Sequence, residues 1–342
     1  MFINNFTEQT NIITGERFAE IADVIFIANI SHKNNSVIKN NYEVINKNQL
    51  YNTVKIKNFE LTDGDVIYVN SSYLELLFHY IRKIKTINNL TLISGQSDRA
   101  IDFNIFKKKP KSITKWYSTN INFEDKNLNS IPLGIANNYS PKNLRVDDFK
   151  KYKKKSVEKK TKLYINLQKN TNRQERSGLK NYFQNKNWVV YQEPTLTIEQ
   201  YLNDLQQYKF VLCPWGNGFD THRVWEVLYS GSIPVTKYHQ TYAGIKDIPI
   251  IFYDNYQEIN LDFLKNKSKN FENKNFEILN INYWKNQICK EDKITFQKKE
   301  LVIKDNFYEK YYWSKLKFIN FIRSKFKVLN YYLNKLKVVF KS

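Results

Sequence analysis

Short apolar runs rich in Val, Ile and Tyr alternate along the chain with segments of helical periodicity, as in α/β domains with parallel sheets. In the first half this pattern predicts a helix from Ser72 to about Lys85. It also predicts strands at residues 23–28, 65–70, 90–94 and 130–135. These elements together indicate a first Rossmann-like domain.

A basic segment separates this half from the next. Residues 150–162, KKYKKKSVEKKTK, have no apolar periodicity and are predicted to form a solvated linker. The alternation then resumes, with predicted strands at 162–167, 188–192 and 209–213. Thr171 with Gln174 and Thr197 with Gln200 have the spacing of capping boxes, so each pair predicts the start of a helix. Two successive α/β units are expected to face one cleft.

Residues 213–235, CPWGNGFDTHRVWEVLYSGSIPV, concentrate turn-forming residues in a chain that has only 9 Gly and 7 Pro. The glycines and prolines of this segment are Pro214, Gly216, Gly218, Gly231 and Pro234. The first three predict a tight turn after the strand, because proline lacks an amide hydrogen and glycine tolerates positive φ. Asp220 or Thr221 can cap the helix that follows, and Gly231 fits the position just past its end.

A strand, a glycine-containing loop and a helix N-terminus form a site for anions, because amide hydrogens and the helix dipole converge there. Arg223 in the first helical turn can donate charge-assisted hydrogen bonds to a diphosphate. Glu226, about one turn further on, can accept hydrogen bonds from a ribose or sugar diol. The pattern therefore predicts a nucleotide-sugar site. Its donor-binding residues are expected to be Gly216, Asn217, Gly218, Asp220, Thr221, His222, Arg223, Glu226, Arg173 and Arg176.

Simpler interpretations of the same residues stay open. Arg223 and Glu226 could form a surface ion pair at i, i+3, and the two glycines could belong to an ordinary turn. Asp220 could act only as an N-cap. Arg173 and Arg176 could lie on a solvated helix face.

Residues 214–235 resemble the exostosin-like glycosyltransferases (family 47 type) and related bacterial and viral enzymes, whose C-terminal domain has the pattern P-x-G-x-G-x-D-x-H-R-x-W-E-x-L-x-x-G-x-I-P-V. The matching positions are Pro214, Gly216, Gly218, Asp220, His222, Arg223, Trp225, Glu226, Leu228, Gly231, Ile233, Pro234 and Val235. The resemblance implies a GT-B-like α/β fold, in which the nucleotide-sugar binds the second of two Rossmann-like domains and the acceptor binds the first. It also implies that no metal or other cofactor is required.

An inverting transfer, which the resemblance implies, needs a base for the acceptor hydroxyl and positive charge at the leaving phosphate. Arg223 is predicted to supply the charge. Asp98, just past the end of a predicted strand, is predicted to be the catalytic base. The alternatives are Asp63, Asp65 and His79, but the two aspartates are expected to serve a turn and the histidine to pack among apolar neighbours.

Composition adds two competing functions. The net charge of +21, together with 24 Tyr and 23 Phe, keeps a basic RNA-binding protein as an alternative. Against it, the basic and aromatic residues are dispersed and no RNA-binding motif is present. A catalytically inactive GT-B-like module that binds glycan is the third hypothesis.

Cys213 and Cys289 have no metal-ligand spacing, and no segment has the pattern of a signal peptide or membrane span, so a cytoplasmic protein is expected.

The segment 305–342 has nine Lys or Arg against two acidic residues. Its apolar residues recur at steps of three and four, which predicts one helical face formed by Leu316, Ile319, Ile322, Phe326, Leu329, Leu333, Leu336 and Phe340. Basic amphipathic helices bind anionic membrane surfaces, so a peripheral location on the inner face of a membrane is expected. The alternative is that this face packs on the catalytic body.

The predicted organisation has an acceptor-side domain at 1–155, a donor domain at 156–275, a crossover helical segment at 276–304 and an amphipathic tail at 305–342. The predicted function is transfer of a sugar from a nucleotide-sugar to a glycan or lipid-linked acceptor. A bacterial or viral surface polysaccharide is the expected product, and nucleic acid is not an expected partner.

Overall fold

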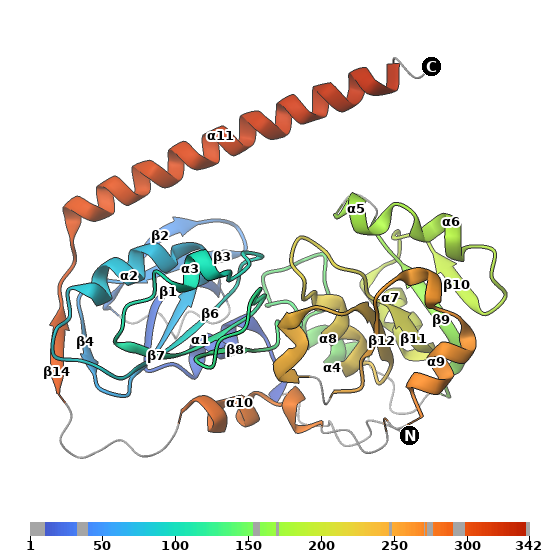
Figure 1. Ribbon diagram of the computed structural model, residues 1–342, viewed down its shortest axis with the longest axis horizontal. Helices are drawn as coiled ribbons and strands as arrows, with labels where there is room; N and C mark the ends of the chain where they lie inside the picture. The colour runs from blue at the N-terminus through green and yellow to red at the C-terminus, as the bar shows by residue number, and fades with distance from the viewer. Residues whose placement is uncertain are drawn as a thin grey trace. The chain divides into compact units, whose positions relative to one another are not determined.

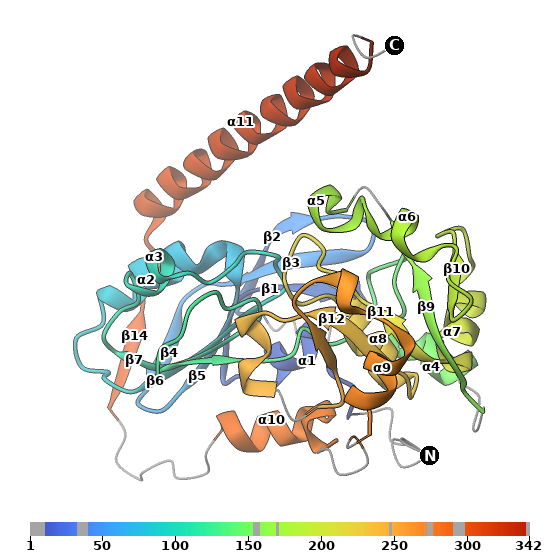
Figure 2. The same cartoon turned by 45° about the vertical axis from the view of Figure 1, so that its right-hand side comes forward.

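The computed structural model describes residues 11–32, 40–152, 158–168, 171–245, 248–269, 271, 276–289 and 298–339. The chain divides into two compact units, Met1–Leu301 and Val302–Ser342. The domain boundaries predicted inside the first unit stay a prediction. Figures 1 and 2 show the first unit as two sheets with helices packed around them.

The first sheet has the strand order β2-β3-β1-β5-β6-β7-β8. Its strands are β1 (Val24–Ser31), β2 (Tyr42–Lys47), β3 (Tyr51–Ile56), β5 (Val66–Asn70), β6 (Leu90–Gly95), β7 (Ile113–Ser118) and β8 (Leu128–Ser130). From β1 to β8 the neighbours are parallel, and β2 and β3 form an antiparallel hairpin at the other edge. The central parallel strands β1, β5 and β6 are almost entirely buried, as expected where helices cover both faces of a sheet. The helices of this half are α1 (Gly15–Glu20), α2 (Leu74–Arg82), α3 (Phe103–Phe106) and α4 (Val146–Tyr152), with the 3₁₀ turn η3 (Ser71–Tyr73) and the short strand β4 (Phe59–Thr62).

The second sheet is parallel throughout and has the order β10-β9-β11-β12-β13. Its strands are β9 (Lys160–Asn166), β10 (Val189–Gln192), β11 (Tyr208–Leu212), β12 (Ile233–Lys237) and β13 (Ile251–Tyr253). The helices around it are α5 (Arg173–Arg176), α6 (Leu179–Phe183), α7 (Ile198–Gln207), α8 (His222–Tyr229) and α9 (Leu261–Lys267), with 3₁₀ turns η4 (Gln240–Ile245), η5 (Tyr256–Glu258) and η7 (Glu277–Leu279). The described residues are therefore mixed α/β with largely parallel sheets, compatible with Rossmann-like units.

Three strands of the first half lie where the apolar pattern predicts them, as β1, β5 and β6. The strand predicted at 130–135 is wrong, because β8 ends at Ser130. Beyond it, Pro132 has no amide hydrogen to donate, and Gly134 adopts a φ of +71° that leaves the extended region. A side chain at Gly134 would lie 2.3 Å from the Ile13 carbonyl oxygen, so the chain can pass Ile13 only with glycine here. Hairpin strands β2 and β3, and also β7, were not predicted.

The helix predicted at Ser72 to Lys85 is the turn η3 followed by α2. In the second half the capping box of Thr197 and Gln200 is confirmed at the start of α7. The cap predicted at Thr171 is wrong, since Asn172 caps α5 by accepting a hydrogen bond from the Glu175 amide at 3.2 Å. The predicted linker 150–162 begins inside α4 and ends inside β9, and residues 153–157 lie outside the described part.

One hydrophobic cluster contains side chains from both sheets, including Ile93 of β6 and Val211 of β11. Helix α10 (Ile281–Ile288) returns to the first half, where the Trp284 ring meets Phe18 of α1 edge-on with centroids 6.3 Å apart. Figures 1 and 2 both show α10 running along the same side as α1. The strand β14 (Lys299–Val302) follows, and its Glu300 accepts a hydrogen bond from Thr86.

Helix α8 has two faces with different tasks. Val224, Trp225 and Leu228 are fully buried in the core, where each large apolar side chain contributes about 1.5–3 kcal/mol. The opposite face carries Arg223 and Glu226 toward a pocket. The apolar residues therefore fix the helix while its polar residues remain available for a ligand.

Gly231 ends α8 with a φ of +75°, as the sequence predicts. Replacement by alanine is expected to lower the free energy of unfolding by about 1 kcal/mol, because a β-carbon is strained in this conformation. Urea denaturation of the full chain measures the change. Gly231→Asn is the matched control, since asparagine tolerates this conformation better and should cost less. Equal losses for the two variants would contradict the backbone explanation.

The second unit is dominated by one helix, α11 (Asn306–Val339), which is 34 residues long. Among its described side chains, Phe307, Phe318 and Phe321 are exposed. The side chains from Phe326 onward lie outside the described part, so the amphipathic face stays a prediction. No described helix is long and apolar enough to cross a membrane.

Candidate functional site

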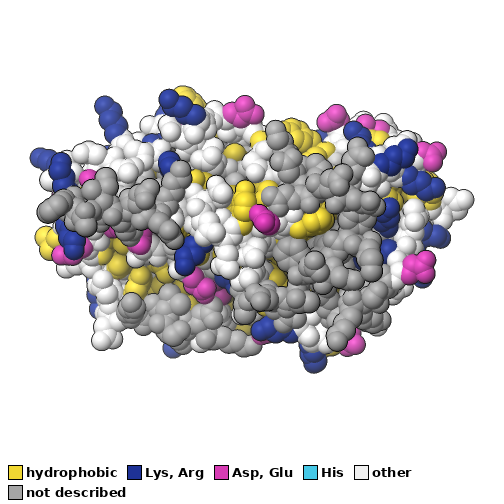
Figure 3. Space-filling model, turned by 90° about the horizontal axis from the view of Figure 1, so that it is seen from below, with side chains coloured by type: hydrophobic (Ala, Val, Ile, Leu, Met, Phe, Trp, Pro, Cys, Tyr) yellow, Lys and Arg dark blue, Asp and Glu magenta, His cyan; other side chains and the backbone are white. Residues whose placement is uncertain are grey.

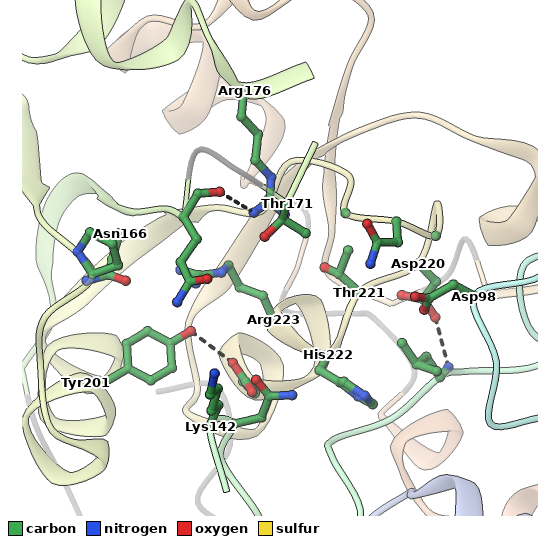
Figure 4. A pocket seen from close by; sticks show the side chains of 18 of the residues that line it. Asp98, Lys142, Asn166, Thr171, Arg176, Tyr201, Asp220, Thr221, His222 and Arg223 are labelled. Atoms are coloured by element: carbon green, nitrogen blue, oxygen red, sulfur yellow. Dashed lines mark hydrogen bonds between the residues drawn. The ribbon is translucent and has the colours of Figure 1, made fainter. Parts of the chain in front are cut away.

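A pocket of about 390 Å³ opens where the carboxyl ends of the second sheet's strands meet loops of the first half. We refer to it as the first pocket, and Figure 4 shows its side chains. The motif residues that line it are Gly216, Asn217, Gly218, Asp220, Thr221, His222, Arg223 and Glu226. Asp98 and Arg176 line it as well, so the fold brings together every predicted site residue except Arg173. Ligands of open α/β sheets gather at this edge.

Arg223 is the strongest cationic feature of the first pocket. Its Nη1 is buried and has no hydrogen-bond partner among the described residues. The guanidinium carbon lies 5.3 Å from the ring centroid of Tyr201, a cation–π contact. Burial alone lowers the pKa of Arg223, but Tyr201 and Glu226 outweigh it and hold the pKa above its usual value. A charged donor is thus kept available beside Thr221, whose buried Oγ1 also has no partner in the described part.

Arg176 also lines the first pocket, near Arg223 (Figure 4), and bonds to the backbone of the surrounding loops. It is buried, and its guanidinium donates to the backbone carbonyls of Trp215, Gln168 and Pro214 at 2.9–3.1 Å. These bonds join the loop after β9 to the loop after β11. Burial and the nearby positive charge of Arg223 lower the pKa of Arg176 to about 10. Two cations held close together destabilise each other, and an anion between them would relieve the repulsion.

Asp220 fixes the floor of the first pocket. Its carboxylate accepts hydrogen bonds from the Leu133 amide at 2.8 Å and from Trp225 Nε1 at 2.9 Å, and Tyr242 also donates to it. In turn, the Asp220 amide donates to Asn120 Oδ1 at 2.9 Å. The helix N-cap is Thr221, which makes no side-chain capping bond, so Asp220 does not act as the N-cap. Asp220 holds the two halves together.

The close approach of this loop to Asn120 also requires glycine at position 218. A β-carbon on Gly218 would lie 2.9 Å from the Asn120 side-chain amide, a distance too short for a real contact. Asn120 itself has a φ of +52°, which a residue with a side chain adopts rarely. Gly218 is therefore needed for the close approach to Asn120, and not only for an ordinary turn.

Burial raises the pKa of Asp220 from its ordinary value of 3.8 to about 7, although its hydrogen bonds oppose the shift. Between these values the folded protein holds a proton that the unfolded chain has released. Asp220 therefore contributes to the free energy of unfolding at low pH, and this contribution is lost as the pH rises toward 7. We expect the free energy of unfolding of the parent, measured relative to Asp220→Asn, to fall across this interval. A difference that stays constant with pH would refute the assignment.

Glu226 is buried and held from two sides. Tyr201 donates to its Oε2 at 2.9 Å and the Leu144 amide to its Oε1 at 3.3 Å. The surface ion pair with Arg223 is not formed in the described structure, because Glu226 is inside the pocket wall. Its carboxylate can still accept a further hydrogen bond from a ligand hydroxyl.

Asp98 and His222 lie at the rim that the first pocket shares with a second one. His222 Nδ1 donates to the Gly134 carbonyl at 2.8 Å, which leaves Nε2 of the neutral ring as an acceptor. Asp98 is exposed, and no hydrogen bond or ion pair within the described residues holds its carboxylate. Of the alternative bases, Asp65 accepts a turn hydrogen bond from the Thr62 amide, as the sequence predicts. Asp63 accepts instead from the amide of Asn88, 25 residues further along the chain.

Sequence reasoning missed several lining residues. The most important is Tyr201, which contacts both Arg223 and Glu226 from α7. The others include Lys142, Asn143, Asn166, Gln168, Thr171 and Thr197. Most follow the carboxyl end of a parallel strand, so the position after each predicted strand was the available signal. Arg173 is exposed on α5 and does not line the first pocket.

The described residues contain no group of three His, Cys, Asp or Glu side chains that could hold a metal ion. Metal independence stays a prediction, since the donor's own phosphates can supply metal ligands.

Comparison with known proteins places this geometry in a family. None of the curated proteins compared with the chain matches it. The family model described as RXYLT1 C-terminal domain matches residues 151–326, about half of the chain. The matched region contains the second sheet, both arginines of the first pocket and the loop 214–218. The chain therefore belongs to the RXYLT1 C-terminal domain family, a family of glycosyltransferases.

Proposed function

We propose that the protein is a GT-B-like glycosyltransferase whose first pocket binds the phosphates and ribose of a nucleotide-sugar. The observation that carries this proposal is the buried, unpartnered Nη1 of Arg223 next to the unpartnered Oγ1 of Thr221. Leaving such groups unpaired costs about 1–3 kcal/mol each, so a ligand that pairs them recovers this energy. An anion is the ligand that also relieves the repulsion between Arg223 and Arg176.

In the proposed reaction the acceptor hydroxyl oxygen bonds to the anomeric carbon of the donor sugar. The bond from that carbon to the phosphate oxygen breaks, and the nucleotide leaves with the electron pair. Asp98 takes the proton of the attacking hydroxyl, and Arg223 neutralises the charge that develops on the leaving phosphate. Asp98 fits this role because, of the carboxylates lining the first pocket, it alone also lines the second pocket and is not already accepting hydrogen bonds within the described part. Attack from the face opposite the leaving group gives inversion, without a metal.

We further propose that the acceptor belongs to a surface glycan or lipid-linked glycan and that α11 brings the enzyme to an anionic cytoplasmic membrane face. The basic residues of 305–342 and the exposed phenylalanines of α11 support this location. The narrower resemblance to exostosin-like enzymes supports the GT-B arrangement. In Figure 3 the described Lys and Arg side chains of the face shown are scattered among acidic ones and form no continuous patch with one another, which supports a transferase over an RNA-binding protein.

The test is a thermal-shift panel on the full chain with UDP, GDP, CMP, dTDP and their common sugar conjugates. One nucleotide class should raise the melting temperature in a concentration-dependent way, as expected for a ligand of the folded state. Absence of any shift with every nucleotide, together with tight and salt-sensitive RNA binding, would replace the proposal by the RNA-binding alternative.

A further inference from the structure

A second pocket of about 220 Å³ lies beside the first one, at the carboxyl ends of the first sheet's central strands. Tyr68 of β5, Gly95 of β6 and Thr119 after β7 form its inner wall. The loop 131–140 forms the opposite wall. Asp98, Leu133 and His222 line both pockets, so a molecule in the second pocket would reach the reacting centre of the first.

Two of the residues that line this space carry buried hydroxyls without partners among the described residues. Tyr68 is only 1% exposed and Thr119 only 4%, and neither Tyr68 Oη nor Thr119 Oγ1 has a hydrogen-bond partner among the described residues. The backbone of Gly95 lies against both, since a β-carbon there would be 3.5 Å from Tyr68 Oη and 3.9 Å from Thr119 Oγ1. Buried hydroxyls are almost always satisfied in folded proteins. This pair therefore indicates a ligand with hydroxyl groups of its own.

The amide side chains around this wall are held in fixed positions. Gln96 has a φ of +54° and is clamped to the backbone of Asn29 by two hydrogen bonds of 2.8 and 2.9 Å. Asn137 accepts from the Glu16 amide and donates to the Tyr139 hydroxyl at 2.7 Å. Backbone strain of this kind persists only where the surroundings enforce it, and it is common at ligand sites. The pocket is thus built before a ligand arrives.

The lining disfavours an anionic occupant. No Lys or Arg lines the second pocket within the described residues, and its ionisable groups other than tyrosine are Asp98 and His222 at the shared rim. A phosphate or carboxylate here would lose its hydration without a cation to compensate, which is costly. The volume corresponds to about seven waters at about 30 Å³ each, the scale of a single sugar ring.

We propose that the second pocket binds one uncharged, hydroxylated sugar unit of the acceptor. Tyr68 and Thr119 pair with its hydroxyls on the inner wall, and its reacting hydroxyl points to the rim between Asp98 and His222. This inference rests on the proposed function of the first pocket and adds the chemical class of the acceptor. Any charged part of the acceptor stays outside the second pocket.

Saturation-transfer NMR on the full chain tests the proposal directly. The probes are methyl glycosides of neutral hexoses and pentoses, compared with the matching uronic acids and sugar phosphates. At least one neutral glycoside should receive saturation, whereas its charged counterparts should not. Tyr68→Phe should weaken its binding by about threefold to tenfold, and Tyr68→Phe with Thr119→Val should weaken it further. Tyr68→Phe should keep or raise the melting temperature of the free protein, because the lost hydroxyl has no partner there.

Tyr253→Phe is the matched control, since Tyr253 is also buried with an unpartnered Oη but does not line the second pocket. Its binding of the glycoside should equal that of the parent. Saturation of charged probes only, no saturation of any neutral probe, or equal loss in Tyr253→Phe would each overturn the inference. Nucleotide thermal shifts measured on the same variants separate the two proposals. If neutral glycosides bind the parent protein but no nucleotide raises its melting temperature, the proposed transferase function is wrong and the sugar-binding pocket stands.

Discussion

Replacement of Arg223 by alanine is expected to weaken nucleotide binding by about 10- to 100-fold, because a charged hydrogen bond to the ligand contributes about 1.5–3 kcal/mol. The loss in kcat/KM should be larger, about 100- to 1000-fold, since in the proposed reaction the same guanidinium neutralises the leaving phosphate in the transition state. Thermal-shift titration measures the first effect and turnover the second. Arg223→Lys should recover part of the affinity, because it keeps the charge but not the two-pronged donor.

Arg82→Ala provides the control for the loss of one arginine. Arg82 lies exposed on α2 and lines neither pocket, so its variant should bind nucleotide as the parent does. A parental nucleotide shift in Arg223→Ala would show that the phosphates bind elsewhere and that the first pocket is wrongly assigned.

The second large effect is expected in Asp98→Asn. If Asp98 takes the proton of the acceptor, kcat should fall by about 100- to 10,000-fold, the usual contribution of a positioned general base. Nucleotide affinity should be unchanged, because Asp98 lies at the rim toward the second pocket, away from Arg223 in Figure 4. Steady-state turnover at saturating donor, paired with thermal shifts, separates the two parameters.

His222→Gln is the companion variant, since His222 also lies at the shared rim and its Nε2 bonds to no described residue. A modest loss in His222→Gln and a large one in Asp98→Asn are expected. The reverse order would assign the proton to His222. Near-parental turnover in both variants would show that the catalytic base does not lie at this rim.

The first pocket could be predicted to a large extent from one segment of sequence, for a physical reason. The strand β11, the turn after it and the helix α8 are contiguous in the chain between residues 208 and 229, so local rules fix their geometry. Gly231 beyond the helix and the pocket-facing Arg223 follow from such rules alone. The role of Asp220 does not, because its partner Leu133 lies 87 residues away. No local pattern encodes that contact.

Arg176 illustrates a second limit of sequence reasoning. Arg176 is predicted to meet the phosphate, and it does line the first pocket, but three of its five N–H donors bond to backbone carbonyls. Which of several nearby arginines faces the ligand depends on loop packing. The missed strand β7 has a comparable cause, since ITKWYS mixes buried and half-exposed positions without the continuous apolar run of its neighbours. Its place in the sheet comes from pairing with β6.

Three hydrogen bonds give the first pocket a fixed floor: the Leu133 amide donates to the Asp220 carboxylate, the Asp220 amide donates to Asn120, and His222 donates to the Gly134 carbonyl. A hinge motion that swings the two sheets apart at this edge would have to break all of them at once. Changes in the width of the pocket are therefore expected to come from its outer rim, formed by Lys142 and the segment 194–198. Donor entry and nucleotide release would then be governed by small loop movements rather than by opening and closing of whole domains.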